Sequence, residues 1–214
     1  MQTRGDRHLL AVQQARELAL LGARLKTIQA VTGLPPRQVQ SLFFPDSNTI
    51  PRGRAPDSAE WFHGANLIVR ADACIVGVKY HQLRQQGLSA ADALLCAYRA
   101  YQAVTRPPSR ISLDRAFNLA SHIDGIWLAR APAFTVSRCT QCGCDHLAAI
   151  GTPLLTHAEC PFCKLLARFD HDPRIQASYR DRRGQAPDDL HLALIEQLHR
   201  RYLPSPVGVA RHAA

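Results

Sequence analysis

The strongest constraint on the fold is a pair of Cys-x-x-Cys motifs in the last third of the chain. Their spacing is Cys-x2-Cys-x17-Cys-x2-Cys, formed by Cys139, Cys142, Cys160 and Cys163. This spacing is typical of a zinc ribbon, in which each motif directs two thiolates at one centre. Four thiolates complete a tetrahedral shell, so the pattern predicts one structural zinc ion rather than a catalytic one. A segment of about thirty residues buries too little apolar surface to order itself, and zinc supplies on the order of 10 kcal/mol to such folds.

Other residues near these motifs could replace one of the four ligands. Cys144 lies two residues beyond the second cysteine and could substitute for it, as could His146 or His157. Only the two matched pairs give the usual geometry on both sides of the ion. The remaining cysteines, Cys74 and Cys96, lie within apolar helical stretches and are expected in the core.

Two enzyme classes share parts of this pattern. The run CPFC resembles a glutaredoxin active site, which leaves a thiol oxidoreductase using Cys160 and Cys163 as an alternative. The βαβ pattern that such a site needs is missing. A nucleobase deaminase is suggested by His157, Glu159 and Pro161, but Glu159 directly adjoins Cys160, whereas that chemistry places Glu and the cysteine pair on separate helices. The sequence therefore predicts that the protein is not an enzyme.

Helical periodicity dominates the chain before the cysteines. Two stretches bearing Pro, Gly or Ser, at 45–56 and 105–110, divide this part into three blocks with apolar residues at helical spacing. The second block opens with Asp57 as an expected cap and runs to Gly87. Further caps are expected at Ser89 and Ser112. The helix after the last cap is expected to carry one apolar stripe, formed by Leu113, Phe117, Ala120, Ile123 and Trp127, and to end at Pro132.

These patterns predict a mainly α-helical protein in three parts. The parts are a helical body at 1–131, a zinc-binding element at 132–169, and a polar tail at 170–214 with one amphipathic helix at about 187–203. Within the zinc-binding element, extended segments are expected at 133–137 and 148–156, and a helix at 164–169. From Pro204 onward the sequence predicts disorder.

The positive charge of the chain is concentrated at its N-terminal end. The formal net charge is +9, of which residues 1–55 carry +5, residues 56–129 carry +1 and residues 130–214 carry +3. A basic end beside a nearly neutral middle favours a nucleic-acid partner, although basic surfaces also serve solubility. Because the sequence lacks an export signal and an apolar run of roughly 18 residues, we expect a cytoplasmic protein without a membrane partner.

Residues 24–44 have the pattern of helix-forming and turn-forming residues that is typical of a helix-turn-helix. A first helix extends to Val31, a turn follows at 32–34, and Pro35 and Pro36 open a second helix. Ile28 and Leu34 are expected to pack between the helices, with Val39 and Leu42 as the buried face of the second. The candidate contacts to base edges are Arg37, Gln38, Gln40 and Ser41, and those to phosphates are Arg24 and Lys26. The alternative is an αα-hairpin within a helical core.

Several short segments together resemble one protein family. They are LLGARL from Leu20 to Leu25, AEWF from Ala59 to Phe62, AYRAY from Ala97 to Tyr101, and the four paired cysteines. In this order and at this spacing they resemble the FlhC family, the bacterial flagellar transcriptional activators, over residues 8–165. The tail after Phe169 departs from the resemblance.

The resemblance implies a function that composition and spacing do not show by themselves. It implies that Cys139, Cys142, Cys160 and Cys163 are zinc ligands, and that the chain joins an FlhD-type partner in a ring-like hetero-oligomer. It further implies binding to double-stranded promoter DNA of flagellar operons and recruitment of RNA polymerase with the housekeeping sigma factor. The leading alternative is a zinc-stabilised protein-interaction module that does not bind DNA.

Overall fold

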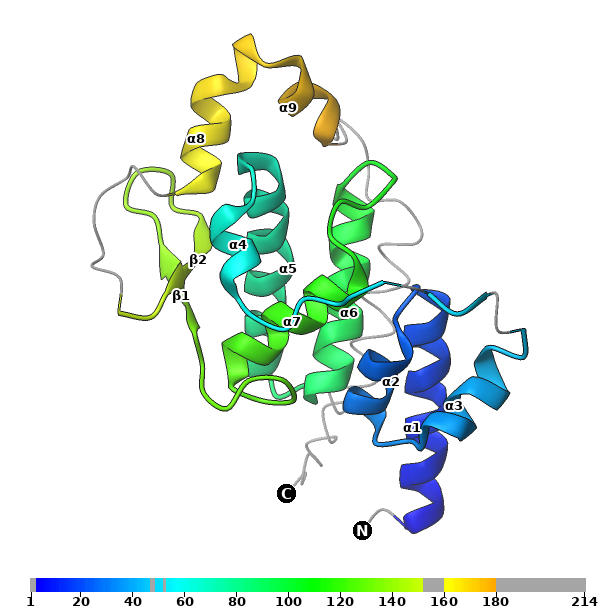
Figure 1. The fold of residues 1–214 in the computed structure, drawn as a ribbon. Helices are drawn as coiled ribbons and strands as arrows, with labels where there is room; N and C mark the ends of the chain where they lie inside the picture. The colour runs from blue at the N-terminus through cyan, green and yellow to red at the C-terminus, as the bar shows by residue number, and fades with distance from the viewer. Residues whose placement is uncertain (1–2, 47–48, 52, 152–159, 180–214) are drawn as a thin grey trace, which may run out of the picture. The chain divides into compact units, whose positions relative to one another are not determined.

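The computed structural model describes residues 3–46, 49–51, 53–151 and 160–179 (Figure 1). This part of the chain is mainly helical, with one small β-hairpin, as the sequence predicts. The helix expected at 187–203 and the segment expected to be disordered beyond Pro204 lie outside the described residues, as does His157. Among the described helices, none has the length and apolar character needed to cross a membrane.

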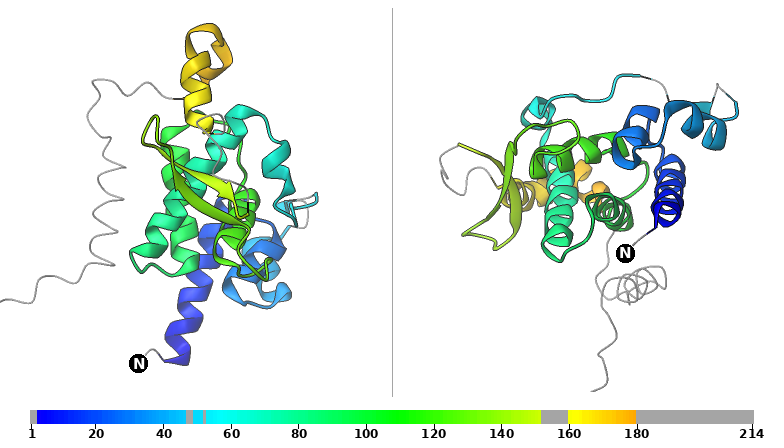
Figure 2. Two further views of the ribbon diagram at one scale, coloured as in Figure 1. Left: turned by 90° about the vertical axis from the view of Figure 1, so that its left-hand side faces the viewer. Right: turned by 90° about the horizontal axis from the view of Figure 1, so that it is seen from below.

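Three helices form the N-terminal part of the fold. They are α1 (Arg4–Leu20), α2 (Leu25–Thr32) and α3 (Pro36–Phe43). A capping box starts α1, in which Thr3 Oγ1 accepts from the Asp6 amide and the Asp6 carboxylate accepts from the Thr3 amide. Gly33 ends α2 in the left-handed conformation with φ 70°. The three helices pack against one another, and α1 also contacts the following bundle through α6 (Ala90–Val104), as Figure 2 shows.

The central bundle is built around one long buried helix. This helix is α5 (Leu67–Gln85), which contacts α6, α7 (Leu113–Asp124) and the short α4 (Glu60–Gly64). Ser89 and Ser112 cap α6 and α7 through hydrogen bonds from the Asp92 and Arg115 amides, which confirms both predicted caps.

Two boundaries in this bundle differ from the sequence prediction. The block expected to run from Asp57 to Gly87 is broken after α4, and Asn66 caps α5 by accepting from the Val69 amide. The predicted apolar stripe ends before Trp127, because Gly125 takes the left-handed conformation with φ 67° and stops α7. Trp127 nevertheless packs beside the helix, with its ring centroid 5.1 Å from that of Phe117.

The cysteine-containing element is a hairpin followed by short helices. Strands β1 (Phe134–Arg138) and β2 (Asp145–Ala149) pair antiparallel, with Phe134 opposite Ala149 and Arg138 opposite Asp145. The first strand confirms the segment expected at 133–137. The second, expected at 148–156, begins earlier, at Asp145, because the hairpin closes directly across the first cysteine motif. Residues 152–156 of that range lie outside the described part of the chain. The predicted helix at 164–169 is α8 (Pro161–Arg168), which begins earlier because a proline occupies its first position.

The last described residues pack against the bundle. After α8 the chain forms a 3₁₀ turn, η3 (Phe169–His171), and then α9 (Pro173–Ser178). Ile175 of α9 is buried with Leu165 of α8 and Ala71 of α5, and Tyr179 forms an isolated β-bridge with Thr105. The packed part of the chain therefore extends to Tyr179 and includes the first ten residues, 170–179, of the predicted polar tail.

Candidate metal centre and nucleic-acid interface

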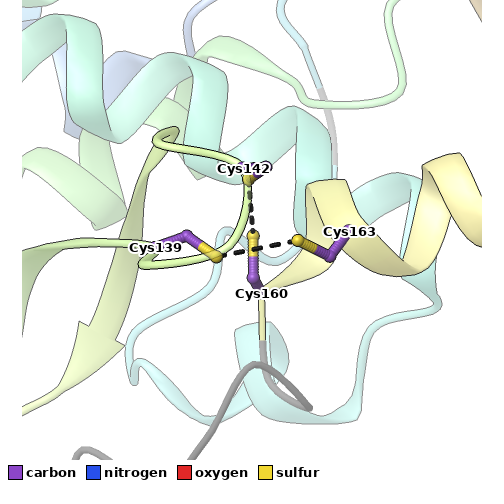
Figure 3. A group of neighbouring side chains, drawn as sticks. All are labelled: Cys139, Cys142, Cys160 and Cys163. Carbon is purple, nitrogen blue, oxygen red and sulfur yellow. Dashed lines mark hydrogen bonds between the residues drawn. The ribbon is translucent and has the colours of Figure 1, made fainter.

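The hairpin and α8 bring the four predicted cysteines together. Cys139 and Cys142 lie in the turn between β1 and β2, while Cys160 precedes α8 and Cys163 lies in its first turn (Figure 3). The sulfur of Cys139 is 3.6 Å from that of Cys163, and the sulfur of Cys142 is 3.7 Å from that of Cys160. All four sulfur atoms lie within 4.8 Å of one another, so this group could hold a metal ion.

The sulfur separations fit a closed tetrahedral site. With metal–sulfur bonds of about 2.3 Å, a zinc tetrahedron places its sulfurs about 3.8 Å apart, whereas a disulfide holds them about 2.0 Å apart. Both short contacts join one Cys-x-x-Cys motif to the other, as expected of ligands around one centre. A redox pair would instead bring together the two sulfurs of one motif.

Local backbone geometry prepares the first motif for a metal. Gly143 has φ 71°, and its amide donates to the Cys139 carbonyl at 2.9 Å, which closes the turn. The backbone amide of Cys142 lies at the Cys139 sulfur and lowers the pKa of that thiol to about 6. Burial raises the pKa of Cys163, in the second motif. A thiolate is therefore favoured at the turn, which is the form that binds a metal.

Two of the alternative ligands of the sequence prediction lie outside this group, and the third, His157, lies outside the described residues. Cys144 is exposed and His146 is half-buried, and neither belongs to the four-sulfur cluster among the described residues. Cys74 is fully buried, which confirms its predicted place in the core, whereas Cys96 is only half-buried.

Cys74 also marks where the hairpin rests on α5. The amide of Leu147 on β2 donates to the Cys74 sulfur at 3.4 Å, and burial raises the pKa of this thiol to about 12. One helical turn further along α5, Gly77 leaves room for the Leu147 side chain: a Cβ built there would lie 2.6 Å from Leu147 Cδ1. The hairpin therefore packs directly on the central helix.

In the helix-turn-helix-like segment the first helix ends at Thr32, one residue later than predicted, and the second begins at Pro36. Most of the candidate DNA contacts face solvent. Arg37, Gln40 and Ser41 on α3 are exposed, as is Lys26 on α2. Gln38 is half-buried, with its Nε2 3.4 Å from His8 Nε2 on α1. Ile28, Leu34 and Val39 are buried between the helices, as predicted.

The expectation for Leu42 was wrong. This side chain is 51% exposed, and Phe44, at the end of α3, is the buried residue instead. The helix ends at Phe43, and Phe44, the residue after it, has a non-helical backbone conformation. The Phe44 side chain is therefore buried in the core, although Leu42 is not.

Arg24 has a structural partner that the sequence did not reveal. Its guanidinium forms an ion pair with Asp114 on α7, and its amide donates to Asp114 Oδ1 at 3.1 Å. Thr27 Oγ1 donates to the same carboxylate oxygen at 2.6 Å. Asp114 is only 2% exposed, so one buried carboxylate ties the start of α2 to the bundle. The phosphate contact expected of Arg24 stays a prediction.

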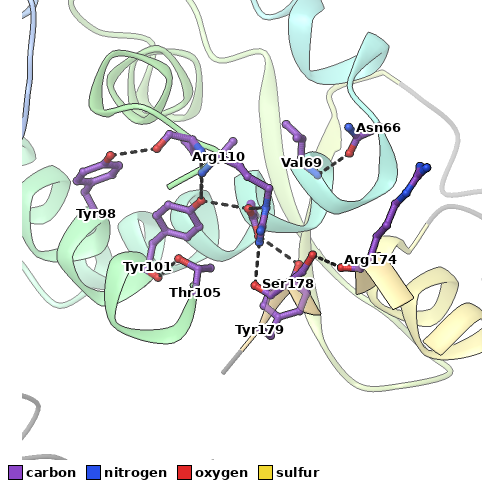
Figure 4. Close-up of polar contacts among 11 residues, drawn as sticks. Asn66, Val69, Tyr98, Tyr101, Thr105, Arg110, Arg174, Ser178 and Tyr179 are labelled. Carbon is purple, nitrogen blue, oxygen red and sulfur yellow. Dashed lines mark hydrogen bonds and ion pairs between the residues drawn. The ribbon is translucent and has the colours of Figure 1, made fainter. Parts of the chain in front are cut away.

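A second buried carboxylate, also absent from the sequence prediction, joins α5 to the last described residues. Asp72 is fully buried and accepts from Tyr101 Oη at 3.0 Å, Arg110 Nε at 2.7 Å and Tyr179 Oη at 3.1 Å. Arg110 Nη2 also donates to the carbonyl of Ser178 at 3.2 Å (Figure 4). The α6–α7 loop and α9 are thus held to one point on α5.

A comparison with known protein families shows which family the chain matches. A family model described as Flagellar transcriptional activator (FlhC) matches residues 7–175, which is most of the 214-residue chain. The matched region contains α2, α3 and all four paired cysteines. A comparison with curated proteins found no match.

Proposed function

Because the chain belongs to the FlhC family of flagellar transcriptional activators, we propose that it activates flagellar (class II) operons by binding promoter double-stranded DNA. In this proposal it acts in the cytoplasm, in a hetero-oligomer with an FlhD-type partner, and recruits RNA polymerase that carries the housekeeping sigma factor. The observation that carries the proposal is the family match over residues 7–175, which includes both the helix-turn-helix-like segment and the cysteine cluster.

The proposed DNA-facing helix is α3. Arg37, Gln40 and Ser41 are spaced by three and four residues, so they share one face of the helix, and all three are exposed. Val39 holds the opposite face in the core. An Arg on such a face can donate two hydrogen bonds to guanine, and Gln can pair with adenine. Gln38 flanks this face, and Lys26, with Arg24, is proposed to contact phosphates.

The proposed cofactor is one structural zinc ion, bound by Cys139, Cys142, Cys160 and Cys163. The sulfur separations of 3.6 and 3.7 Å between the motifs support it. The ion would join the hairpin to α8, and both of these contact α5. In this proposal the metal stabilises the fold, while α3 contacts the DNA.

The experiment that tests DNA binding is retardation of a flagellar promoter fragment by the full chain with its FlhD-type partner. We expect retardation that weakens steeply from low to moderate salt, because phosphate contacts release counterions. Arg37→Ala should lose about 1 to 3 kcal/mol of discrimination between the promoter and unrelated DNA. Arg130→Ala removes an exposed arginine between α7 and β1 and serves as the matched control.

The outcomes separate the proposal from its alternative. Failure to retard the fragment at every salt concentration would favour a protein-interaction module without DNA binding. Retardation with unchanged promoter preference in Arg37→Ala would remove α3 from base recognition and leave it as an αα-hairpin within the fold.

A further inference from the structure

A pocket lies where the N-terminal helices meet the bundle. Its volume is about 470 Å³, within the range of roughly 300 to 1,000 Å³ that holds small ligands. It is lined by Arg24, Arg54, Ala55, Pro56, Asp57, Trp61, Ser112 and Arg115. Three of these side chains are guanidinium groups, so the lining is dominated by positive charge.

The three arginines differ in how firmly they are held. Arg24 is paired with the buried Asp114. Arg54 pairs with Asp57, but the two side chains are 86% and 68% exposed, and such a surface pair is weak enough to be exchanged for another partner. Arg115 stacks over Trp61, with its Cζ 5.0 Å from the ring centroid. Among the described residues Arg115 forms no ion pair, and stacking leaves the N–H groups at the edge of its guanidinium free to donate.

The side of the pocket formed by Trp61 and the 54–57 loop is held by hydrogen bonds to one buried side chain. Trp61 Nε1 donates to Asn118 Oδ1 at 2.8 Å, and Asn118 Nδ2 donates to the carbonyl of Pro56 at 3.1 Å. Asn118 is fully buried on α7. This side chain therefore holds both Trp61 and the 54–57 loop in place, so the pocket is formed before any ligand arrives.

We propose that this pocket binds a phosphate group. Guanidinium groups match phosphate oxygens with paired, charge-assisted hydrogen bonds. Arg115 would hold the anion from the rigid wall, and Arg54 would turn from Asp57 to meet it. Two carboxylates, Asp57 and the buried Asp114, stand near three arginines, which leaves one positive charge to be neutralised. The proposal does not rest on base recognition by α3.

A phosphate bound in this pocket would lie next to the start of α2. Arg24 lines the pocket and is also the residue immediately before α2. Two sources can supply the group: a small phosphate-bearing molecule or the DNA backbone. Inorganic pyrophosphate and a 20-bp duplex of unrelated sequence serve as the probes for the two sources.

The test measures the affinity of the full chain for each probe in four variants. Arg115→Gln should weaken binding roughly tenfold, because a charge-assisted donor pair is lost. Asp57→Asn should strengthen binding roughly threefold, since it removes a competing carboxylate and releases Arg54. Arg130→Gln, a change of the same kind at an exposed arginine outside the pocket, should leave both affinities unchanged. Arg54→Gln repeats the first test at a side chain that is 86% exposed, where folding is not at risk.

Opposite shifts in the Arg115 and Asp57 variants support the proposal, and the probe that shows them identifies the source. If neither probe's affinity moves in these directions relative to Arg130→Gln, the pocket does not bind phosphate. That result would leave the Arg37→Ala test of promoter recognition untouched, so the two proposals can fail separately.

Discussion

At the scale of single residues, buried carboxylates hold together segments that are distant in the sequence. Asp72 accepts from Tyr179, which lies 107 residues away, and Asp114 accepts from Arg24, which lies 90 residues away. Neither aspartate exceeds 2% exposure. A buried acid is stable only when its oxygens are fully hydrogen-bonded, so loss of its charge leaves the donors around it poorly matched.

Asp72→Asn should destabilise the fold by about 3 kcal/mol, because Arg110 would remain near the buried position without its counter-charge. The measurement is the free energy of unfolding from urea titration. Asp57→Asn is the matched control: its carboxylate is 68% exposed, so its removal should leave the free energy of unfolding nearly unchanged. Equal losses in the two variants would contradict the role assigned to Asp72.

Tyr101 should make stability fall at alkaline pH. Burial raises the pKa of its phenol from 10.0 to about 12. The folded state therefore retains this proton more tightly than the unfolded state, so the stabilisation is present below pH 10 and is lost as pH rises from about 10 to 12. Tyr101→Phe should show a shallower decline of the unfolding free energy over that window. An unchanged decline would assign the pH dependence to other groups, such as Tyr179, whose pKa burial also raises.

The metal-site residues were predictable from sequence, whereas the buried carboxylates were not. The Cys-x-x-Cys spacing is a local pattern that sets the turn within each motif. The four cysteines lie together in the structure, as this spacing predicts: Cys139, Cys142, Cys160 and Cys163. Asp114 gives no such signal, because its partner Arg24 comes from a distant element. Arg24 accordingly looked like a free basic residue. Only the ion pair and the hydrogen bond to Asp114 on α7 show that it is paired.

At the scale of elements, the helix starts at Ser89 and Ser112 were predicted correctly, whereas the expected cap at Asp57 was wrong, because α4 begins at Glu60 with Ala59 at its cap position. Ser89 and Ser112 act through hydrogen bonds to residues three positions away, and such local contacts are visible in the sequence. The break at Asn66 lets α4 follow its own direction, and Phe62 of α4 lies against Phe134 of β1 with ring centroids 5.1 Å apart. A contact between such distant segments is not encoded by helical periodicity.

Packing of β2 on α5 can be tested at Gly77. Alanine there would favour the helix by about 1 kcal/mol but would place its Cβ against the buried Leu147. We expect a net loss of about 1 kcal/mol in unfolding free energy. Gly64→Ala in α4, where a Cβ would meet no atom within 4 Å, should cause no loss.

A double-mutant cycle identifies the cause of that loss. Leu147→Ala alone should cost about 2 to 5 kcal/mol because a buried side chain is removed. In the Leu147→Ala background, Gly77→Ala should no longer destabilise, since the clashing atoms are absent. A penalty that persists in that background would show that the contact with β2 is not its source.

At the scale of the whole molecule, the proposed zinc site should control access to the core. The full chain should contain one zinc per chain, and an alkylating reagent should label Cys144 while sparing the four ligands and Cys74. After removal of the metal with a chelator, the four ligands should react. Cys74 should then react as well, because the hairpin that covers it is no longer held. Mass spectrometry of the labelled peptides measures each cysteine separately.

Two results would contradict this account in different ways. If the four paired cysteines react equally with and without chelator and no zinc is found, the metal proposal fails and a thiol oxidoreductase gains support. If the ligands become reactive but Cys74 stays protected, the hairpin holds its place on α5 without the metal. Cys144, exposed in either state, reports that the reagent is active.

The link from Asp114 to Arg24 and Thr27 has a consequence for how the protein would meet its operator. Because this carboxylate joins the start of α2 to α7, the helix-turn-helix-like segment is held in a fixed orientation on the bundle. In an assembly with several such segments, their separation along the double helix would be dictated by the protein body. A promoter would then be recognised by the distance between its contact points as well as by their bases. Inserting half a helical turn between those points should therefore weaken binding even when every contacted base is kept.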